Sequence, residues 1–173
     1  SEDAKAAMKN RKTPIASFYA NLLTFENYYE NQWFPYTMPI SDIKGLAQAL
    51  KNIEQDTDIV ARHQNISKRV RYAVQKCGLE LYQKDGFCGT VTVIKVPGQV
   101  TASAILEKMR LEHQIMIAGS FDVMEGQVLR IGHMGENCRE DKVRCTLHAL
   151  QLVLTELGVT LSDDLETCFM EKQ

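Results

Sequence analysis

The spacing of apolar residues changes along the chain, and each spacing predicts a different kind of element. Apolar residues recur every three or four positions in four segments, which predicts helices over residues 42–55, 58–77, 101–112 and 137–157. Ser41 and Thr101 precede two of these segments as N-caps, and Asn137 begins an Asn-x-x-Glu sequence that has the form of a capping box. Gly78 follows the second segment, where a helix commonly ends in a left-handed conformation.

Shorter runs of apolar and β-branched residues predict strands between these helices. The runs span residues 79–82, 90–96, 115–118 and 128–133, and the Pro97-Gly98 pair stops the second of them. The third and fourth runs are close enough in the chain to pair with each other. Strand, helix, two strands and helix is the order of an α+β fold, so we expect a two-layer sandwich of helices on a small, mostly antiparallel sheet.

The first 40 residues follow a different pattern. Residues 1–12 predict a short polar helix, and the segment from residue 15 to 36 then holds eight of the 13 aromatic residues. A stacking platform for single-stranded nucleic acid would interleave aromatics with Lys and Arg, and none occurs between residues 14 and 36. We therefore expect these side chains to pack on a large apolar partner surface. They are Phe18, Tyr19, Phe25, Tyr28, Tyr29, Trp33, Phe34 and Tyr36.

A rigid elbow, Phe34-Pro35-Tyr36-Thr37-Met38-Pro39, follows the aromatic segment. Each proline fixes its own φ and pushes the preceding residue towards an extended conformation. Thr37 is thus held between two prolines. On the residues alone, its hydroxyl is most simply one that caps a turn or the start of a helix.

Charge and cysteine content narrow the function classes. A formal net charge of −2 gives no reason to expect nucleic acid or an anionic membrane as partner, and no apolar run approaches a membrane span of about 18 residues. The five cysteines are odd in number and include no Cys-x-x-Cys, so they indicate neither a disulfide framework nor a zinc site. We expect a cytoplasmic protein without a metal, in which Cys138 and Cys145 share a buried helix face.

Arg130 is the outstanding candidate for chemistry. It lies within Val128-Leu129-Arg130-Ile131-Gly132-His133-Met134-Gly135, where alternation predicts a strand that aims its side chain. The guanidinium is a planar fork that matches a carboxylate or phosphate. An ion pair with a neighbouring acidic side chain is an equally good reading of the residues alone. His133 should point to the opposite face of the strand and should not share a ligand with Arg130.

The run Arg-Ile-Gly-His-Met-Gly before a helix resembles the C-terminal signature of the class V pyridoxal-phosphate-dependent aminotransferases, the group of serine–pyruvate and alanine–glyoxylate aminotransferases. The resemblance implies that Arg130 binds the carboxylate of an amino-acid substrate. The elbow is also similar to a segment of this family, which implies that the Thr37 hydroxyl contacts the cofactor phosphate of the other subunit in a homodimer. Phe34 stands where some members have a tyrosine, which makes Tyr36 a candidate substitute.

The same resemblance implies the architecture of a larger enzyme. Residues 57–173 would be the small C-terminal domain of a fold-type I enzyme, and residues 1–56 the tail of its large domain. The Schiff-base lysine would lie upstream of residue 1. We therefore expect no catalytic residue and no covalently bound pyridoxal 5′-phosphate in this chain, and no activity of the chain alone.

The implied reaction moves an amino group from a small amino acid such as alanine or serine to a 2-oxo acid. The loop between residues 117 and 126 lacks a catalytic cysteine, which argues against a desulfurase, while a lyase stays open. The run Ala118-Gly119-Ser120-Phe121-Asp122 is less glycine-rich than is common in the family, which leaves the substrate preference open. The alternative is a free-standing α+β module that binds a small carboxylate through Arg130, or oligomerises, without catalysis.

Overall fold

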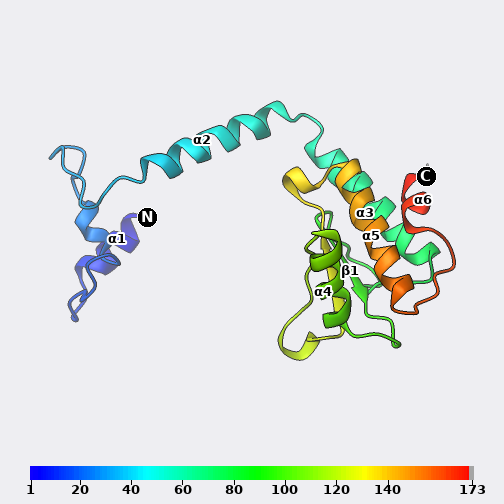
Figure 1. Ribbon diagram of the computed structural model, residues 1–173. Coiled ribbons are helices and arrows are strands. Elements are labelled where there is room, and N and C mark those ends of the chain that lie inside the picture. Colours follow the sequence, from blue (N-terminus) through cyan, green and yellow to red (C-terminus); the bar gives the residue numbers. More distant parts are fainter. Residues whose placement is uncertain (172–173) are drawn as a thin grey trace. The chain divides into compact units, whose positions relative to one another are not determined.

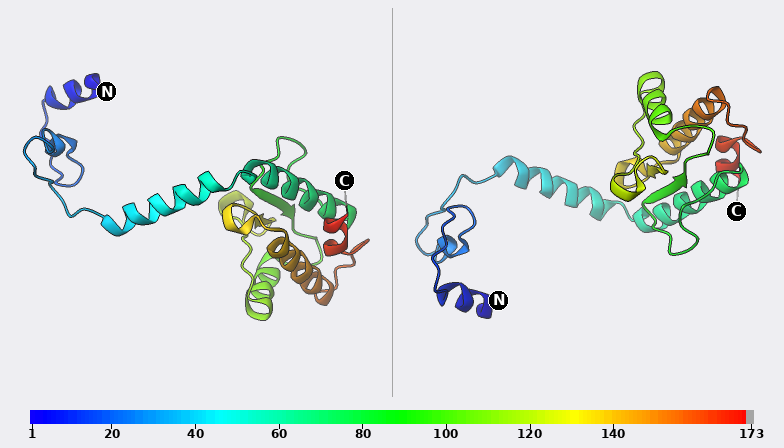
Figure 2. Two further views of the ribbon diagram at one scale, coloured as in Figure 1. Left: turned by 90° about the horizontal axis from the view of Figure 1, so that it is seen from above. Right: turned by 90° about the horizontal axis from the view of Figure 1, so that it is seen from below.

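The computed structural model describes residues 1–171, which divide into two compact units. The first unit is Ser1–Gln55 and the second begins at Asp56, one residue before the expected division (Figures 1 and 2). The assignment of these units to two domains of a larger enzyme stays a prediction. Within residues 1–171, no helix combines the length and the apolar character needed to cross a membrane.

The first unit contains helix α1 (Glu2–Lys9), the 3-10 helix η1 (Leu22–Phe25) and helix α2 (Ile40–Gln55). None of these three elements has a buried residue. Helix α2 begins two residues before the predicted start, because the Pro39 carbonyl already accepts a hydrogen bond from the Ile43 amide at 3.0 Å. Ser41 therefore lies inside the helix, and its prediction as an N-cap was wrong.

The second unit has the predicted α+β composition. Its elements in chain order are α3 (Ile59–Lys76), β1 (Val91–Lys95), α4 (Ala102–His113), η2 (Asp122–Met124), β2 (Val128–Gly132), η3 (Gly135–Asn137), α5 (Glu140–Glu156) and α6 (Leu165–Met170). Strands β1 and β2 pair antiparallel, which confirms the antiparallel sheet. The predicted strands 79–82 and 115–118 each contribute only one isolated bridge, Leu81 with Ile94 and Ala118 with Arg130.

Helix starts and stops explain most of the remaining local structure. Gly78 adopts φ +84° after α3, as its predicted role as a helix stop requires, and the Thr101 side chain caps α4 by accepting from the Ala104 amide at 3.3 Å. The capping box at Asn137 was wrong, because residues 135–137 form η3 and α5 begins only at Glu140.

That later start also separates two cysteines that were expected to share a buried helix face. Cys138 precedes α5 and is fully buried, whereas Cys145 lies on the helix and is exposed. The seven-residue spacing between them has no helical meaning, because only one of the two residues belongs to the helix. The predicted common burial was therefore wrong.

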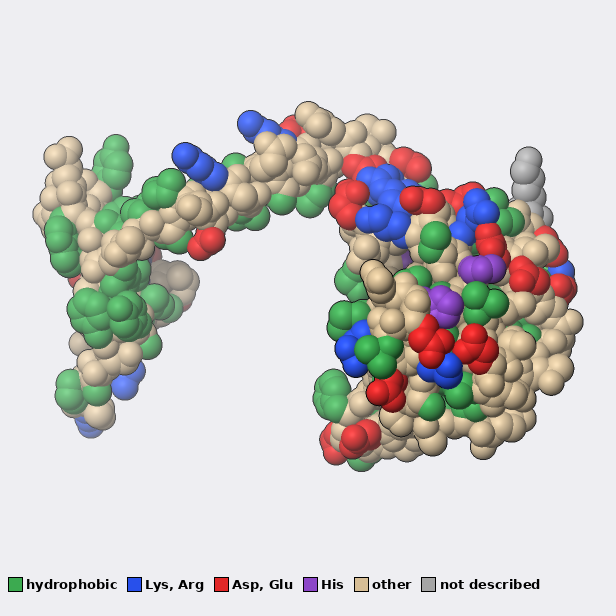
Figure 3. Space-filling view, viewed as in Figure 1, with side chains coloured by type: hydrophobic (Ala, Val, Ile, Leu, Met, Phe, Trp, Pro, Cys, Tyr) green, Lys and Arg blue, Asp and Glu red, His purple; other side chains and the backbone are tan. Residues whose placement is uncertain are grey.

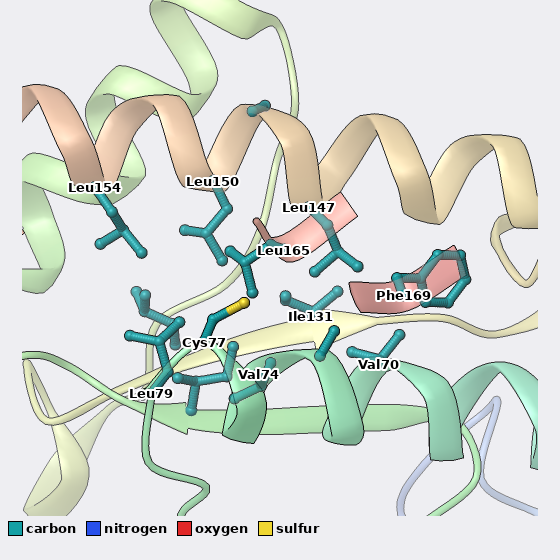
Figure 4. Packing of buried hydrophobic residues seen from close by; sticks show 14 of the residues in the cluster. Val70, Val74, Cys77, Leu79, Ile131, Leu147, Leu150, Leu154, Leu165 and Phe169 are labelled. Carbon is teal, nitrogen blue, oxygen red and sulfur yellow. The ribbon is translucent and has the colours of Figure 1, made fainter. Parts of the chain in front are cut away.

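The core of the second unit lies on one face of the sheet. Ile94, Leu129 and Ile131 are buried there with side chains from α3, α5 and α6. Figure 4 shows Leu147, Leu150 and Leu154 reaching from α5 towards residues of α3, with α6 alongside. On the other face of the sheet, most side chains keep some exposure, and this face carries Arg130.

Candidate functional site

The backbone of Arg130 is fixed by pairing on both sides of β2. Across the sheet it stands opposite Val93 of β1. On the other side its amide donates to the Ala118 carbonyl at 2.6 Å, and its carbonyl accepts from the Ala118 amide at 3.0 Å. The side chain therefore leaves the backbone from the middle of β2, which confirms that Arg130 lies on a strand.

One nitrogen of the Arg130 guanidinium is held by the protein and two are free. Nε donates a hydrogen bond to the Gly119 carbonyl at 2.6 Å. Within residues 1–171, the terminal Nη1 and Nη2 have no hydrogen-bond or ion-pair partner, so the expected alternative of a neighbouring acidic side chain is not realised there. Two adjacent N–H groups on a half-buried, oriented guanidinium are the geometry that takes a carboxylate bidentately.

Lys95 lies on the same face of the sheet as Arg130 and has a different role. Its ammonium group pairs with the carboxylate of Glu80, in the segment that bridges to β1. The side chain is partly exposed. Lys95 is therefore engaged in a surface ion pair.

His133 belongs to the core and not to the Arg130 site. Its ring is fully buried, and Nε2 lies 2.9 Å from the Thr92 hydroxyl. Burial disfavours the charged imidazolium and lowers the pKa of His133 below its ordinary value. The expectation that Arg130 and His133 point to opposite faces is confirmed.

The two expected cofactor contacts lie in the first unit and differ in availability. The Tyr36 hydroxyl donates to the Phe18 carbonyl at 2.6 Å and lies 3.5 Å from the Thr24 hydroxyl. Thr37 is exposed, and within the described residues its hydroxyl has no hydrogen-bond partner, so the expected capping role is absent there. A free hydroxyl on a backbone held by two prolines fits one oxygen of a phosphate, whereas Tyr36 would first have to exchange a partner.

The ring of Tyr36 stands at the centre of an aromatic cluster formed by Phe18, Tyr19, Phe25, Tyr28, Phe34 and Tyr36. Its ring centroid lies 5.2 Å from that of Tyr19 and 5.3 Å from that of Phe18. Both neighbours stay largely exposed, Phe18 at 63% and Tyr19 at 77%. The aromatic cluster thus orders the elbow while leaving apolar rings in contact with water.

Known aminotransferases are similar to this chain in sequence. The chain is 31% identical over 167 residues to an uncharacterized aminotransferase of Methanocaldococcus jannaschii, and the match covers 94% of the chain and 43% of that relative. A serine–glyoxylate aminotransferase of Arabidopsis thaliana is 29% identical over 135 residues, which cover 76% of the chain and 33% of the relative. The homologues of this chain are alanine–glyoxylate and serine–glyoxylate aminotransferases and related class V aminotransferases. The part of these aminotransferases that the chain matches is C-terminal, and it spans less than half of their length.

Solved aminotransferases share the fold. The alanine–glyoxylate aminotransferase of Nostoc sp. superposes with a TM-score of 0.77 at 28% identity, over 89% of this chain and 42% of its own. The ureidoglycine–glyoxylate aminotransferase of Bacillus subtilis gives a TM-score of 0.86 at 23% identity, over 98% of this chain and 45% of its own. No family profile matches the chain. The α+β small-domain fold expected from the class V signature is confirmed.

Sequence reasoning missed one group at the site, the carbonyl of Gly119. It accepts from Arg130 Nε although 11 residues separate the two positions. The contact depends on the single bridge between Ala118 and Arg130, and no residue pattern marks such a bridge. The nearest signal was the predicted pairing of segments 115–118 and 128–133, which brings Gly119 beside β2.

Proposed function

We propose that this chain is the C-terminal part of a pyridoxal-phosphate-dependent aminotransferase that moves an amino group from a small amino acid, such as alanine or serine, to a 2-oxo acid. Arg130 binds the carboxylate of the amino-acid substrate. The homology of the chain to glyoxylate aminotransferases supports the reaction class. The single observation that carries the assignment to Arg130 is the guanidinium held at Nε with both terminal nitrogens free.

Transamination requires a group that orients the substrate carboxylate, and the Arg130 guanidinium is suited to that role. When bound, pyridoxal phosphate supplies an electron sink that weakens the bonds at the substrate α-carbon. Arg130 fixes the carboxylate attached to that carbon, and two parallel hydrogen bonds set the orientation of the carboxylate plane as well as its position. Since a guanidinium keeps its charge, this hold does not depend on pH in the neutral range.

Thr37 contacts the cofactor phosphate of a second subunit in a homodimer, and Tyr36 is the second candidate for that contact. The free hydroxyl and the proline-fixed backbone of Thr37 support its assignment. The exposed rings of the aromatic cluster support a further protein surface against the first unit. The lysine that holds the cofactor belongs to a segment upstream of this chain.

The first test replaces Arg130 in the polypeptide that carries this chain in its source. We expect Arg130→Leu to weaken binding of the amino donor by at least ~1.5 kcal/mol, the lower bound for a hydrogen bond to a charged group, or about tenfold in dissociation constant. Arg110→Leu, at an exposed position in the last turn of α4, is the matched control and should leave the affinity unchanged. Unchanged affinity in Arg130→Leu would remove this residue from the site.

A second measurement separates the enzyme from the binding module. The polypeptide isolated from its source is reduced with borohydride, which fixes a lysine-bound cofactor in place, and its intact mass is measured. We expect a chain about twice as long as this one that carries a reduced pyridoxal-phosphate adduct. A chain of this length without an adduct would support the free-standing carboxylate-binding module instead.

A further inference from the structure

The peptide that holds Arg130 Nε is itself fixed between β2 and α4. On one side, Ala118 makes two backbone hydrogen bonds to Arg130, at 2.6 and 3.0 Å. On the other side, the Leu106 side chain of α4 lies so close to Gly119 that an added Cβ would stand 3.1 Å from Leu106 Cδ1. Real Cβ atoms rarely have so close a neighbour, so any larger residue at position 119 would require Leu106 to give way by a few tenths of an ångström.

We infer that Gly119 and Leu106 are positioning residues for Arg130: Leu106 packs into the space that Gly119 leaves and thereby fixes the carbonyl that aims the guanidinium. The inference rests on the proposed carboxylate role of Arg130. Neither residue needs to touch the substrate. Their effect passes through the Gly119 carbonyl, whose displacement would turn the plane of the fork away from a bound carboxylate.

The surroundings of Leu106 explain why this support is firm. Leu106 is half-buried and packs against the hydrophobic core, in which its α4 neighbours Ile105 and Met109 are fully buried. Interiors are close-packed, so the part of the Leu106 side chain that packs against this core resists displacement by a larger neighbour. Helix α4 thus supports the orientation of an arginine that lies on β2, in a different element.

The test reads the guanidinium directly, by the ¹H–¹⁵N signal of Arg130 Nε–H in the 173-residue chain without any ligand. We expect this proton to exchange with solvent at least about tenfold more slowly than that of exposed Arg110, because it is hydrogen-bonded and half-buried. Gly119→Val and Leu106→Ala should each abolish that protection, the first by crowding and the second by removing the support. The double variant exchanges the two volumes and should restore it.

Gly98→Val is the matched control, since an added Cβ there meets no atom within 4 Å and the residue has an ordinary φ. It should leave the Arg130 signal unchanged. An unprotected Nε–H in the natural chain, or protection that survives both single changes, would overturn the inference. If Gly119→Val fails to fold, Leu106→Ala and the double variant still decide.

The kinetic readout in the cofactor-loaded enzyme is a rise of about tenfold in KM for the amino donor in each single variant, with kcat nearly unchanged and KM recovered in the double variant. A merely structural defect would lower the amount of active enzyme, and therefore the apparent kcat, and would leave KM for the amino donor unchanged. The two proposals fail separately: Arg130→Leu tests carboxylate binding, while the Nε–H signal tests positioning without a carboxylate.

Discussion

Helices α2 and α5 have nearly the same length and both carry an apolar stripe, yet only α5 buries that stripe in a hydrophobic core. Helix α2 has 16 residues and none is buried, while α5 has 17 and buries six. The stripe of α2 is exposed throughout, and Figure 3 shows green side chains along this helix. Its members are Ile40, Ile43, Leu46, Leu50 and Ile53.

The contrast teaches that an apolar stripe predicts a need for a partner and not the partner itself. An isolated helix of about 15 residues is marginally stable in water, and most helical stability in proteins comes from packing of the apolar face. Helix α5 obtains that packing from α4 and α6. For α2 and the aromatic cluster, the proposed remainder of the enzyme would supply it.

The largest expected effect compares one aromatic side chain from each unit. Phe169 is fully buried, so Phe169→Ala should lower the free energy of unfolding by about 3–5 kcal/mol. Trp33 is 58% exposed, and Trp33→Ala should change it by less than about 0.5 kcal/mol. Urea unfolding followed by far-ultraviolet circular dichroism measures both. A comparable loss at Trp33 would show that the first unit has a core of its own.

A smaller effect is expected at the buried polar pair of the second unit. Thr92→Val removes the hydroxyl that lies 2.9 Å from His133 Nε2 and leaves a buried ring nitrogen without its partner. The cost should be about 1–3 kcal/mol of unfolding free energy. Thr92→Ser keeps the hydroxyl and serves as the control. If Thr92→Ser loses stability and Thr92→Val does not, packing of the methyl group and not the hydrogen bond is what matters.

The smallest effect concerns Asp56, the first residue of the second unit. The Arg62 guanidinium donates to both of its carboxylate oxygens, at 2.8 and 2.5 Å, and holds the pKa of Asp56 below its ordinary value. The folded state therefore favours the carboxylate. Its contribution is full above the ordinary pKa of about 3.9 and disappears as pH falls through the lowered folded value.

Asp56→Asn should thus lower the melting temperature at pH 7, and the difference from the natural chain should close in acid. Melting curves between pH 7 and pH 2 measure the gap. Glu54→Gln, at an exposed position in the last turn of α2, should show no such gap at any pH. A gap for Asp56→Asn that persists at the lowest pH would mean that its cause is not the carboxylate charge.

Periodicity predicted the second unit well because its elements are amphipathic and packed. Helices α3 and α4 and strands β1 and β2 lie within two residues of their predicted bounds. The errors fall where two local signals compete. Helix α2 already begins after Pro39, so Ser41 cannot be its N-cap. Asn137 belongs to the 3-10 helix η3 and therefore does not cap α5. Segments 79–82 and 115–118 are apolar enough for strands but meet the sheet at only one residue each.

At the candidate site, the sequence identified Arg130 as the candidate residue but did not predict the contacts that hold its side chain. Arg130 and its strand follow from alternation, and the resemblance to class V enzymes supplied a role for it. The free terminal nitrogens and the Gly119 carbonyl depend on tertiary contacts between segments that no short pattern relates. The same holds for Tyr36, whose hydroxyl is engaged by a carbonyl 18 residues earlier in the chain.

Hydrogen bonds join helix α6 to α3, although the two helices lie far apart in the sequence. Arg69 Nε donates to the Phe169 carbonyl, 100 residues later, at 2.8 Å, and the Tyr72 hydroxyl donates to Glu171 at 2.8 Å. A ribosome that adds about 5–20 residues per second therefore delivers α6 roughly 5–20 seconds after α3. During that interval the apolar side of α3, including Val70 and Val74, is not yet covered by α6. Nascent chains of this protein should therefore be clients of ribosome-associated chaperones until residue 170 has emerged.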